Sequence, residues 1–292
     1  MRCMEELVKR LGHLPLALVQ TGKYMMETGT SCPKYLELYA SSWSRLVAEA
    51  PQLRDYENGS IHTTWMISYE RVTHANPTAA KLLQLWSYLD HQDIWYELFY
   101  RGSQGCLECS WFHDLAQEEI SFKKTIKTLL AYSLVESRRD SESYSIHPVV
   151  HDWCTETISY GKADLVILAC TVIGFAVPDH TEPEYWLSEQ RLIPHADRCT
   201  QRLYQLDPAN AIEYSKSNDA FHGLGYLFFD QGKMVDAEKM YQRALSGYEK
   251  AWGPEHISTL DTVCNLGLLY AEQGKVVEAE NMYRRALDGF KI

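Results

Sequence analysis

The sequence has no cluster of basic residues. Its 28 Lys and Arg are outnumbered by 39 Asp and Glu, which gives a formal net charge of -11, and no long basic run occurs. Proteins that bind phosphate-rich partners use clustered Lys and Arg. We therefore expect neither nucleic acid nor an anionic membrane surface as the main partner.

Long apolar runs are also missing. The longest, Leu165–Val177, is flanked by Asp164 and Asp179, and it is shorter than the roughly 18 to 20 residues that cross a bilayer. It predicts a buried helix and no membrane segment. The start of the chain is charged, unlike a secretory signal, and the eight cysteines are scattered. Both features favour reduced thiols and a cytoplasmic location.

Catalytic motifs are absent as well. None of the four Gly-Lys pairs is followed by Ser or Thr or has the upstream glycine of a phosphate-binding loop. The sequence contains neither G-x-S-x-G nor H-E-x-x-H. Without a phosphate-binding loop, ATP hydrolysis is not expected. We predict a protein that is not an enzyme, with no catalytic residue.

What the sequence does contain is an internal duplication. Residues 224–250 align with residues 266–292 at a period of 42, with 15 identities in 27 pairs. In each copy, large and small residues share the first helix, a Gln-Gly-Lys turn follows, and the second helix carries Ala, Tyr and Ala at spacings of four and three. These spacings place one stripe on one helix face. The pattern predicts two helical hairpins whose helices approach closely.

The duplicated unit resembles the tetratricopeptide repeat. Its length and the link at residues 252–256 (Trp-Gly-Pro-Glu-His) are similar to the longer variety found in kinesin light chains. The resemblance implies a groove lined by the first helices that binds a peptide or a partner protein, with Asn265 in that groove. The alternative is that Asn265 is only a solvated helix residue.

A repeat array buries its core only by stacking, so its ends need covering. An amphipathic helix at residues 184–206 is expected to cap the first repeat. The face of the second repeat has no comparable cover in the sequence. We expect further repeats missing from this chain, or a partner at that face, and self-association through it is a further possibility.

The first half predicts helices followed by a small hairpin. Leucines at 7, 11, 14 and 18 recur at helical spacing, and Pro15 begins a helix. Further on, a helix near residues 120–131 runs into two short alternating segments around a polar turn at 138–143. A last helix carries Val149, Val150 and Trp153. Helix, hairpin and helix together describe a winged-helix unit.

Two motifs in this half resemble those of NB-ARC proteins, the nucleotide-switched STAND ATPases of immunity and cell-death signalling. Residues 11–18 (Leu-Gly-His-Leu-Pro-Leu-Ala-Leu) are similar to the "GLPLAL" element, and residues 144–153 are similar to the "MHD" element. Fungal members of this family often join the module to the same long repeats. The resemblance implies that Pro15 packs near adenine and that His147 reaches the ADP phosphate.

The chain departs from the family pattern at important positions. His13 stands where glycine is usual, and Pro148 replaces the aspartate that follows the histidine. Because the phosphate-binding loop is absent, the nucleotide-binding core is expected to be lost or never included. For Pro15 the alternative role is a helix N-terminal proline, and for His147 it is a histidine at the hairpin end bonded to the backbone.

Metal and DNA sites are weaker alternatives. Cys106, Cys109 and His113 have zinc-like spacing but no fourth ligand, and His147 and His151 lie four residues apart with Pro148 between them. We predict no metal site. The would-be recognition helix, 149–160, contains neither Lys nor Arg, which disfavours DNA binding.

The sequence thus predicts a mainly α protein with four parts. These are an incomplete helical ARC-like segment (1–55), a winged-helix-like domain with a small β-hairpin (56–160), a helical linker or cap (161–210) and a solenoid of two tetratricopeptide repeats (211–292). We expect a non-catalytic regulatory and protein-interaction module without a cofactor. The rival is an ADP/ATP switch completed by a separate phosphate-binding core, and a third possibility is a truncated gene product without an independent role.

Overall fold

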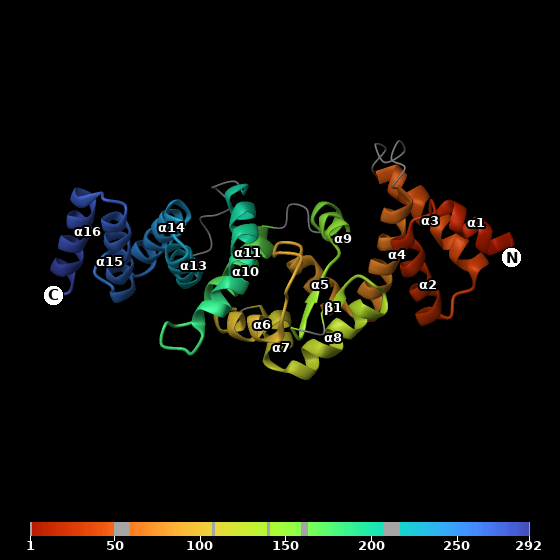
Figure 1. Cartoon of the computed structure of the whole chain (residues 1–292), viewed down its shortest axis with the longest axis horizontal. Coiled ribbons are helices and arrows are strands. Elements are labelled where there is room, and N and C mark those ends of the chain that lie inside the picture. The colour runs from red at the N-terminus through yellow and green to blue at the C-terminus, as the bar shows by residue number, and fades with distance from the viewer. Residues whose placement is uncertain are drawn as a thin grey trace. The chain divides into compact units, whose positions relative to one another are not determined.

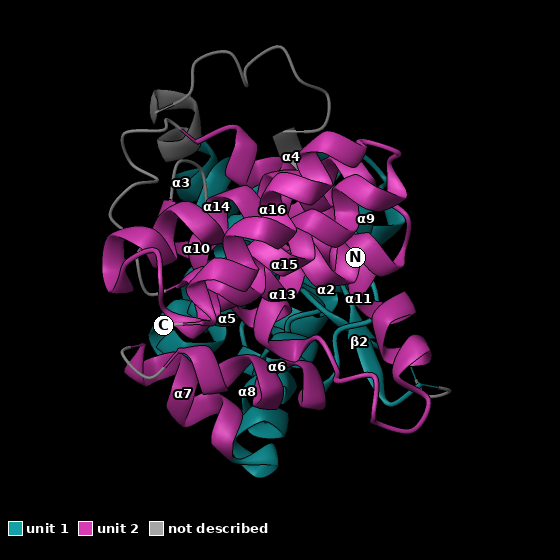
Figure 2. Cartoon of the chain, turned by 90° about the vertical axis from the view of Figure 1, so that its left-hand side faces the viewer, with its two compact units in different colours: residues 1–87, 91–95, 118–160 teal, residues 88–90, 96–117, 161–292 magenta. Residues whose placement is uncertain are grey.

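The structure is a computed structural model that describes residues 2–49, 59–106, 109–138, 141–158, 163–206 and 217–291 (Figure 1). It is mainly α-helical, as predicted, and its named strands form one two-stranded antiparallel sheet within the described part. The chain divides into two compact units (Figure 2). Unit 1 comprises residues 1–87, 91–95 and 118–160, and unit 2 comprises residues 88–90, 96–117 and 161–292.

These units do not coincide with the four predicted parts. Residues 96–117, predicted within the winged-helix-like domain, cluster with unit 2. The predicted boundaries near residues 55, 160 and 210 lie outside the described residues, so the four-part division stays a prediction.

Four helices form the first part of unit 1. Their bounds are α1 (Arg2–Arg10), α2 (Pro15–Thr28), α3 (Cys32–Glu49) and α4 (Gly59–Ala75). The α1–α2 turn uses a left-handed backbone at Gly12 (φ 62°) and His13 (φ 57°), and Pro15 then occupies the first turn of α2. α1 packs against α3, whereas α2 and α3 both pack against α4. The predicted helical segment is therefore present.

The remainder of unit 1 contains the predicted helix, hairpin and helix. The elements are α5 (Pro77–Trp86), α8 (Glu119–Ala131), β1 (Glu136–Arg138), β2 (Ser143–Ser145), α9 (Pro148–Trp153) and the π-helical turn η3 (Cys154–Ile158). In the hairpin Ser137 pairs with Tyr144. Tyr144 also exchanges two backbone hydrogen bonds with Ile94 on its other side, at 2.8 and 2.9 Å. β2 therefore lies between β1 and Ile94, a pairing that the sequence pattern does not predict.

Unit 2 is built around one helix that is buried over most of its surface. Its elements are α6 (Tyr96–Gly102), η2 (Ser103–Gly105), α7 (Ser110–Gln117), α10 (Ala163–Ala176), α11 (Tyr185–Tyr204), α13 (Asn218–Asp230), α14 (Met234–Trp252), α15 (Ile257–Glu272) and α16 (Val276–Gly289). The predicted buried helix is α10, and it packs against α6, α11 and α13. No helix in the described part is both long and apolar enough to cross a membrane.

The two predicted hairpins are α13–α14 and α15–α16. Gly232 and Gly274 form their turns with φ angles of 70° and 74°, a left-handed conformation that favours glycine. A Cβ on Gly225 would lie 2.6 Å from the Tyr241 ring. The small residue therefore allows the two helices of the hairpin to approach, as the pattern predicted.

The cap on the first repeat differs from the prediction. The expected helix at 184–206 is present as α11, but α10 makes the more extensive contact with α13. The close approach occurs at glycine, since a Cβ on Gly174 would lie 2.1 Å from the carbonyl oxygen of Ala220. The apolar helix α10, which has no amphipathic pattern, thus makes most of the contact with α13. Helix α11 makes the smaller contact beside it.

Candidate functional site

The candidate site is the exposed side of the first helices of the two repeats. Asp219 and His222 on α13 are three residues apart, and Asp261, Asn265 and Leu268 on α15 follow at spacings of four and three. Each set therefore lies on one face of its helix. Asp219, Asp261 and Leu268 are exposed, whereas His222 and Asn265 are half-buried.

Asn265 connects the two repeats. Its side-chain nitrogen lies 3.2 Å from Nε2 of His222, and His222 Nδ1 lies 2.9 Å from the hydroxyl of Thr262. That hydroxyl donates to the carbonyl oxygen of Ser258 at 2.7 Å, so it accepts from Nδ1–H. Nε2 then accepts from the amide of Asn265, which assigns the neutral imidazole from the network.

The bridge gives Asn265 a role inside the fold, and its place in a partner-binding groove stays a prediction. The residue is not simply solvated, because its amide links α15 to α13. Burial lowers the pKa of His222, while the carboxylates of Asp261 and Asp219 act in the opposite direction. The neutral histidine therefore suits its half-buried, amide-bonded position.

The charged groups on this face are acidic. Asp261 lies 3.6 Å from His222 Nε2, and 63% of its side chain is exposed. Asp219 accepts a hydrogen bond from the hydroxyl of Tyr248. The exposed Leu268 adds an apolar surface, 43% exposed. The face therefore presents two carboxylates and one exposed apolar side chain.

The last hairpin also has an apolar face. A groove of about 520 Å³ is lined by Ala271, Val276, Ala279, Glu280, Tyr283, Arg284 and Leu287. Val276 and Leu287 are 70% and 57% exposed. This is the face that further repeats or a partner are expected to cover. Self-association through it stays a prediction.

The two residues assigned from the NB-ARC resemblance lie at helix starts. Pro15 is exposed in the first turn of α2. His147 is exposed at the N-cap of α9, and its Nδ1 accepts from the backbone nitrogen of Val149 at 3.4 Å. Figure 1 shows α2 and α9 apart, with α4 between them in that view. Both residues have a local helix-starting role, and nucleotide contact by either stays a prediction.

Among the described residues, the cysteine and histidine candidates do not form a group of three side chains close enough to share a metal ion. Cys106 is buried and its Sγ donates to the carbonyl oxygen of Gly102 at 3.4 Å, while Cys109 and His113 belong to the turn that begins α7. His151 is buried, with Nε2 3.3 Å from the carbonyl oxygen of Trp86. The side chains of Cys106 and His151 thus have hydrogen-bond partners in the fold, and the absence of a metal site at these candidates stays a prediction.

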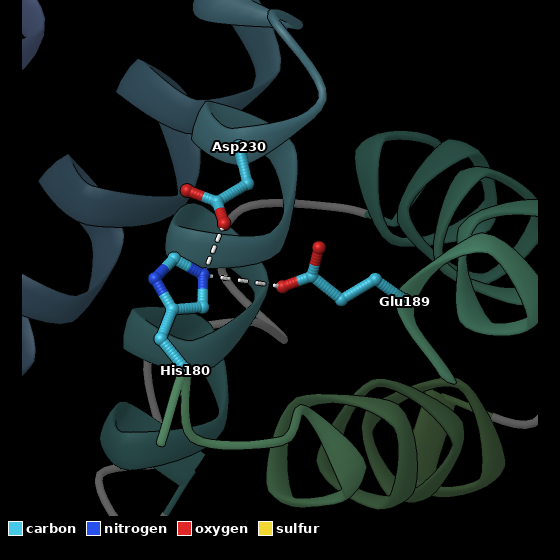
Figure 3. Close-up of side chains that lie close together, drawn as sticks. All are labelled: His180, Glu189 and Asp230. Carbon is cyan, nitrogen blue, oxygen red and sulfur yellow. Dashed lines mark hydrogen bonds and ion pairs between the residues drawn. The ribbon is translucent and has the colours of Figure 1, made fainter. Parts of the chain in front are cut away.

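A different cluster, which the sequence reasoning missed, brings three donor side chains together. His180, Glu189 and Asp230 lie close to one another in unit 2 (Figure 3). They come from a loop, from α11 and from the end of α13, respectively. No spacing rule links positions 180, 189 and 230, so only the tertiary fold reveals the cluster.

Comparisons with known proteins agree with the repeat prediction. Residues 217–292 match the family model described as "Tetratricopeptide repeat". Residues 71–162 match the model described as "Domain of unknown function (DUF7779)". The match at 71–162 includes α9 and the hairpin but assigns no activity to them.

A curated relative covers most of the chain. A "Nucleotide-binding leucine-rich repeat (NLR)-like protein" of Hyaloscypha variabilis is 26% identical over 276 residues, which cover 89% of this chain and 25% of the relative. The chain thus spans a quarter of the length of that relative. Residues 217–292 are tetratricopeptide repeats, and the chain is similar to one part of an NLR-type protein.

Proposed function

We propose that this chain is a non-catalytic regulatory module of an NB-ARC-type signalling protein and that its repeats bind a peptide segment of a protein partner. The observation that carries the proposal is the open face of α13 and α15 in residues that match tetratricopeptide repeats. The similarity to an NLR-like protein supports the signalling context. The acidic residues Asp219 and Asp261 favour a segment with basic or amide groups over an acidic one.

The proposal can be tested with peptides selected from a display library on the full chain. Selected peptides are measured by fluorescence anisotropy against the wild type and Leu268→Glu. A charge at this 43% exposed position removes an apolar contact, and we expect affinity to fall by about tenfold or more, corresponding to roughly 1.4 kcal/mol.

A matched control is available on the opposite helix of the first hairpin. Val235 in α14 is 65% exposed, so Val235→Glu makes the same kind of change away from the proposed face. Peptide affinity should be unchanged in this variant. If both substitutions lower the peptide affinity equally, or if Leu268→Glu leaves it unchanged, the binding site lies elsewhere. Asn265→Ala is a poorer first probe because it also breaks the bridge to His222.

The second candidate function is a nucleotide switch completed by a phosphate-binding core on another chain. It is favoured by the motif-like segments around Pro15 and His147. On this view His147 would leave its hydrogen bond to the α9 backbone, 3.4 Å long, in order to reach a phosphate. Such an exchange would link nucleotide binding to the start of α9.

A further inference from the structure

Three possible metal ligands meet where α11 faces the first repeat. Nε2 of His180 lies 3.7 Å from Oε1 of Glu189 and contacts Oδ2 of Asp230. The three donor atoms all lie within 4.8 Å of one another. Figure 3 shows both carboxylates directed at the same imidazole nitrogen from two different helices.

The buried carboxylate of Glu189 lacks a full set of partners. Its residue is 1% exposed, and among the described residues Oε1 has no hydrogen-bond donor. Oε2 accepts only a long bond, 3.3 Å, from the side chain of Gln231. Burial raises the pKa of Glu189, and the neighbouring charge of Asp230 adds to this effect. A buried carboxylate such as that of Glu189 is costly unless a positive charge lies beside it.

Aromatic rings hold the histidine in place. The ring of Tyr185 lies 4.2 Å from that of His180, and the ring of Tyr226 lies 4.9 Å away on α13. The imidazole is therefore packed between two elements while its Nε2 faces the carboxylates.

We propose that His180, Glu189 and Asp230 bind one divalent transition-metal ion such as Zn²⁺. The ligand atoms are Nε2 of His180, Oε1 of Glu189 and Oδ2 of Asp230. Imidazole nitrogen suits Zn²⁺ and its neighbours in the transition series, whereas Ca²⁺ takes six to eight oxygen ligands. Metal–ligand bonds of about 2.0 to 2.2 Å require His180 and Asp230 to exchange their direct contact for contacts to the ion. Water completes the coordination.

Such an ion would hold the first repeat against α11 and the loop before it. Asp230 ends α13, Glu189 belongs to α11, and His180 lies in the loop between α10 and α11. One ion thus joins the end of α13 to α11 and to the loop that precedes α11. The inference does not depend on the partner-binding proposal, because it concerns the stability of the repeats and not their groove.

The test is a titration of the purified full chain with Zn²⁺ alone, after chelator treatment, by calorimetry and by thermal unfolding. We expect one equivalent to bind and to raise the unfolding temperature, because a ligand that binds only the native state stabilises it. Glu189→Gln and Asp230→Asn, which keep side-chain size, should each weaken binding by at least about tenfold and lose the thermal shift. His180→Ala, in an exposed loop, serves if either variant fails to fold.

The control is Asp197→Asn, which removes a carboxylate of α11 that pairs with Lys233 outside the cluster and should leave Zn²⁺ affinity unchanged. Co²⁺ provides a second readout, since ligation by nitrogen and oxygen gives visible bands without a thiolate charge-transfer band. A thiolate band would place the ion on cysteine and overturn the proposal. It is equally overturned if the wild type binds no Zn²⁺ or if the cluster variants bind as the wild type does.

Discussion

At the scale of residues, His222 links the two repeats as a neutral imidazole whose Nε2 accepts from the Asn265 amide. The unfolded chain protonates a histidine near pH 6.5, whereas burial lowers the pKa of His222 in the native state despite the opposing effects of Asp261 and Asp219. Near this pH the unfolded state therefore binds more protons at His222 than the native state does. Lowering the pH favours unfolding for that reason. The stability contributed by the neutral bridge is lost as the pH falls below about 6.5.

We predict that the free energy of unfolding of the wild type falls more steeply than that of His222→Gln between about pH 7.5 and pH 5.5. Urea unfolding followed by circular dichroism at both pH values measures the difference. Comparing the two proteins removes the contributions of the other titrating groups, which they share. A parallel loss of stability in both proteins would show that His222 does not titrate in this range.

At the scale of elements, glycine decides how closely α10 and α13 approach. A Cβ at Gly174 would lie 2.1 Å from a backbone oxygen of Ala220, and a backbone atom cannot turn aside as a side chain can. We predict that Gly174→Ala lowers the free energy of unfolding by about 1 to 3 kcal/mol, as overpacked cores do. Denaturant unfolding of the full chain provides the measurement.

Gly22 in α2 is the matched control for that substitution. It is exposed, and no atom lies within 4 Å of a Cβ built on it. Alanine there restricts the unfolded chain without a clash and should raise stability by about 0.5 to 1 kcal/mol. Opposite signs for the two Gly→Ala changes are the expected result. Destabilisation of equal size at both positions would mean that close packing at Gly174 is not the cause.

At the scale of the whole molecule, the chain carries motif-like segments without a phosphate-binding loop. We predict that Mg²⁺–ADP gives no saturable heat of binding at micromolar concentrations and that no phosphate is released from ATP, because the sequence lacks the phosphate-binding-loop motif whose backbone amides would hold the phosphates. Calorimetry and a phosphate-release assay on the full chain test this. A clear micromolar isotherm that His147→Ala removes would instead support the nucleotide-switch alternative.

Local signals explain why much of the fold could be predicted. The 42-residue duplication predicted α13–α16. In both copies the turn glycine has a left-handed backbone, and a glycine of the first helix lies against the tyrosine of the second. Pro15 and Pro148 mark the starts of α2 and α9, because a ring-locked φ and a missing N–H suit the first turn of a helix. The sequence by itself also determined the helix, hairpin and helix of residues 119–153.

Only the tertiary structure decided which segments meet. The cover of α13 by α10, the pairing of Ile94 with Tyr144, the bridge from Asn265 to His222 and the cluster of His180, Glu189 and Asp230 all join residues distant along the chain. Periodicity reports which face of a helix is apolar, but it does not name the helix that covers that face. Those contacts depend on how the helices pack, so they follow from the folded chain and not from any local pattern.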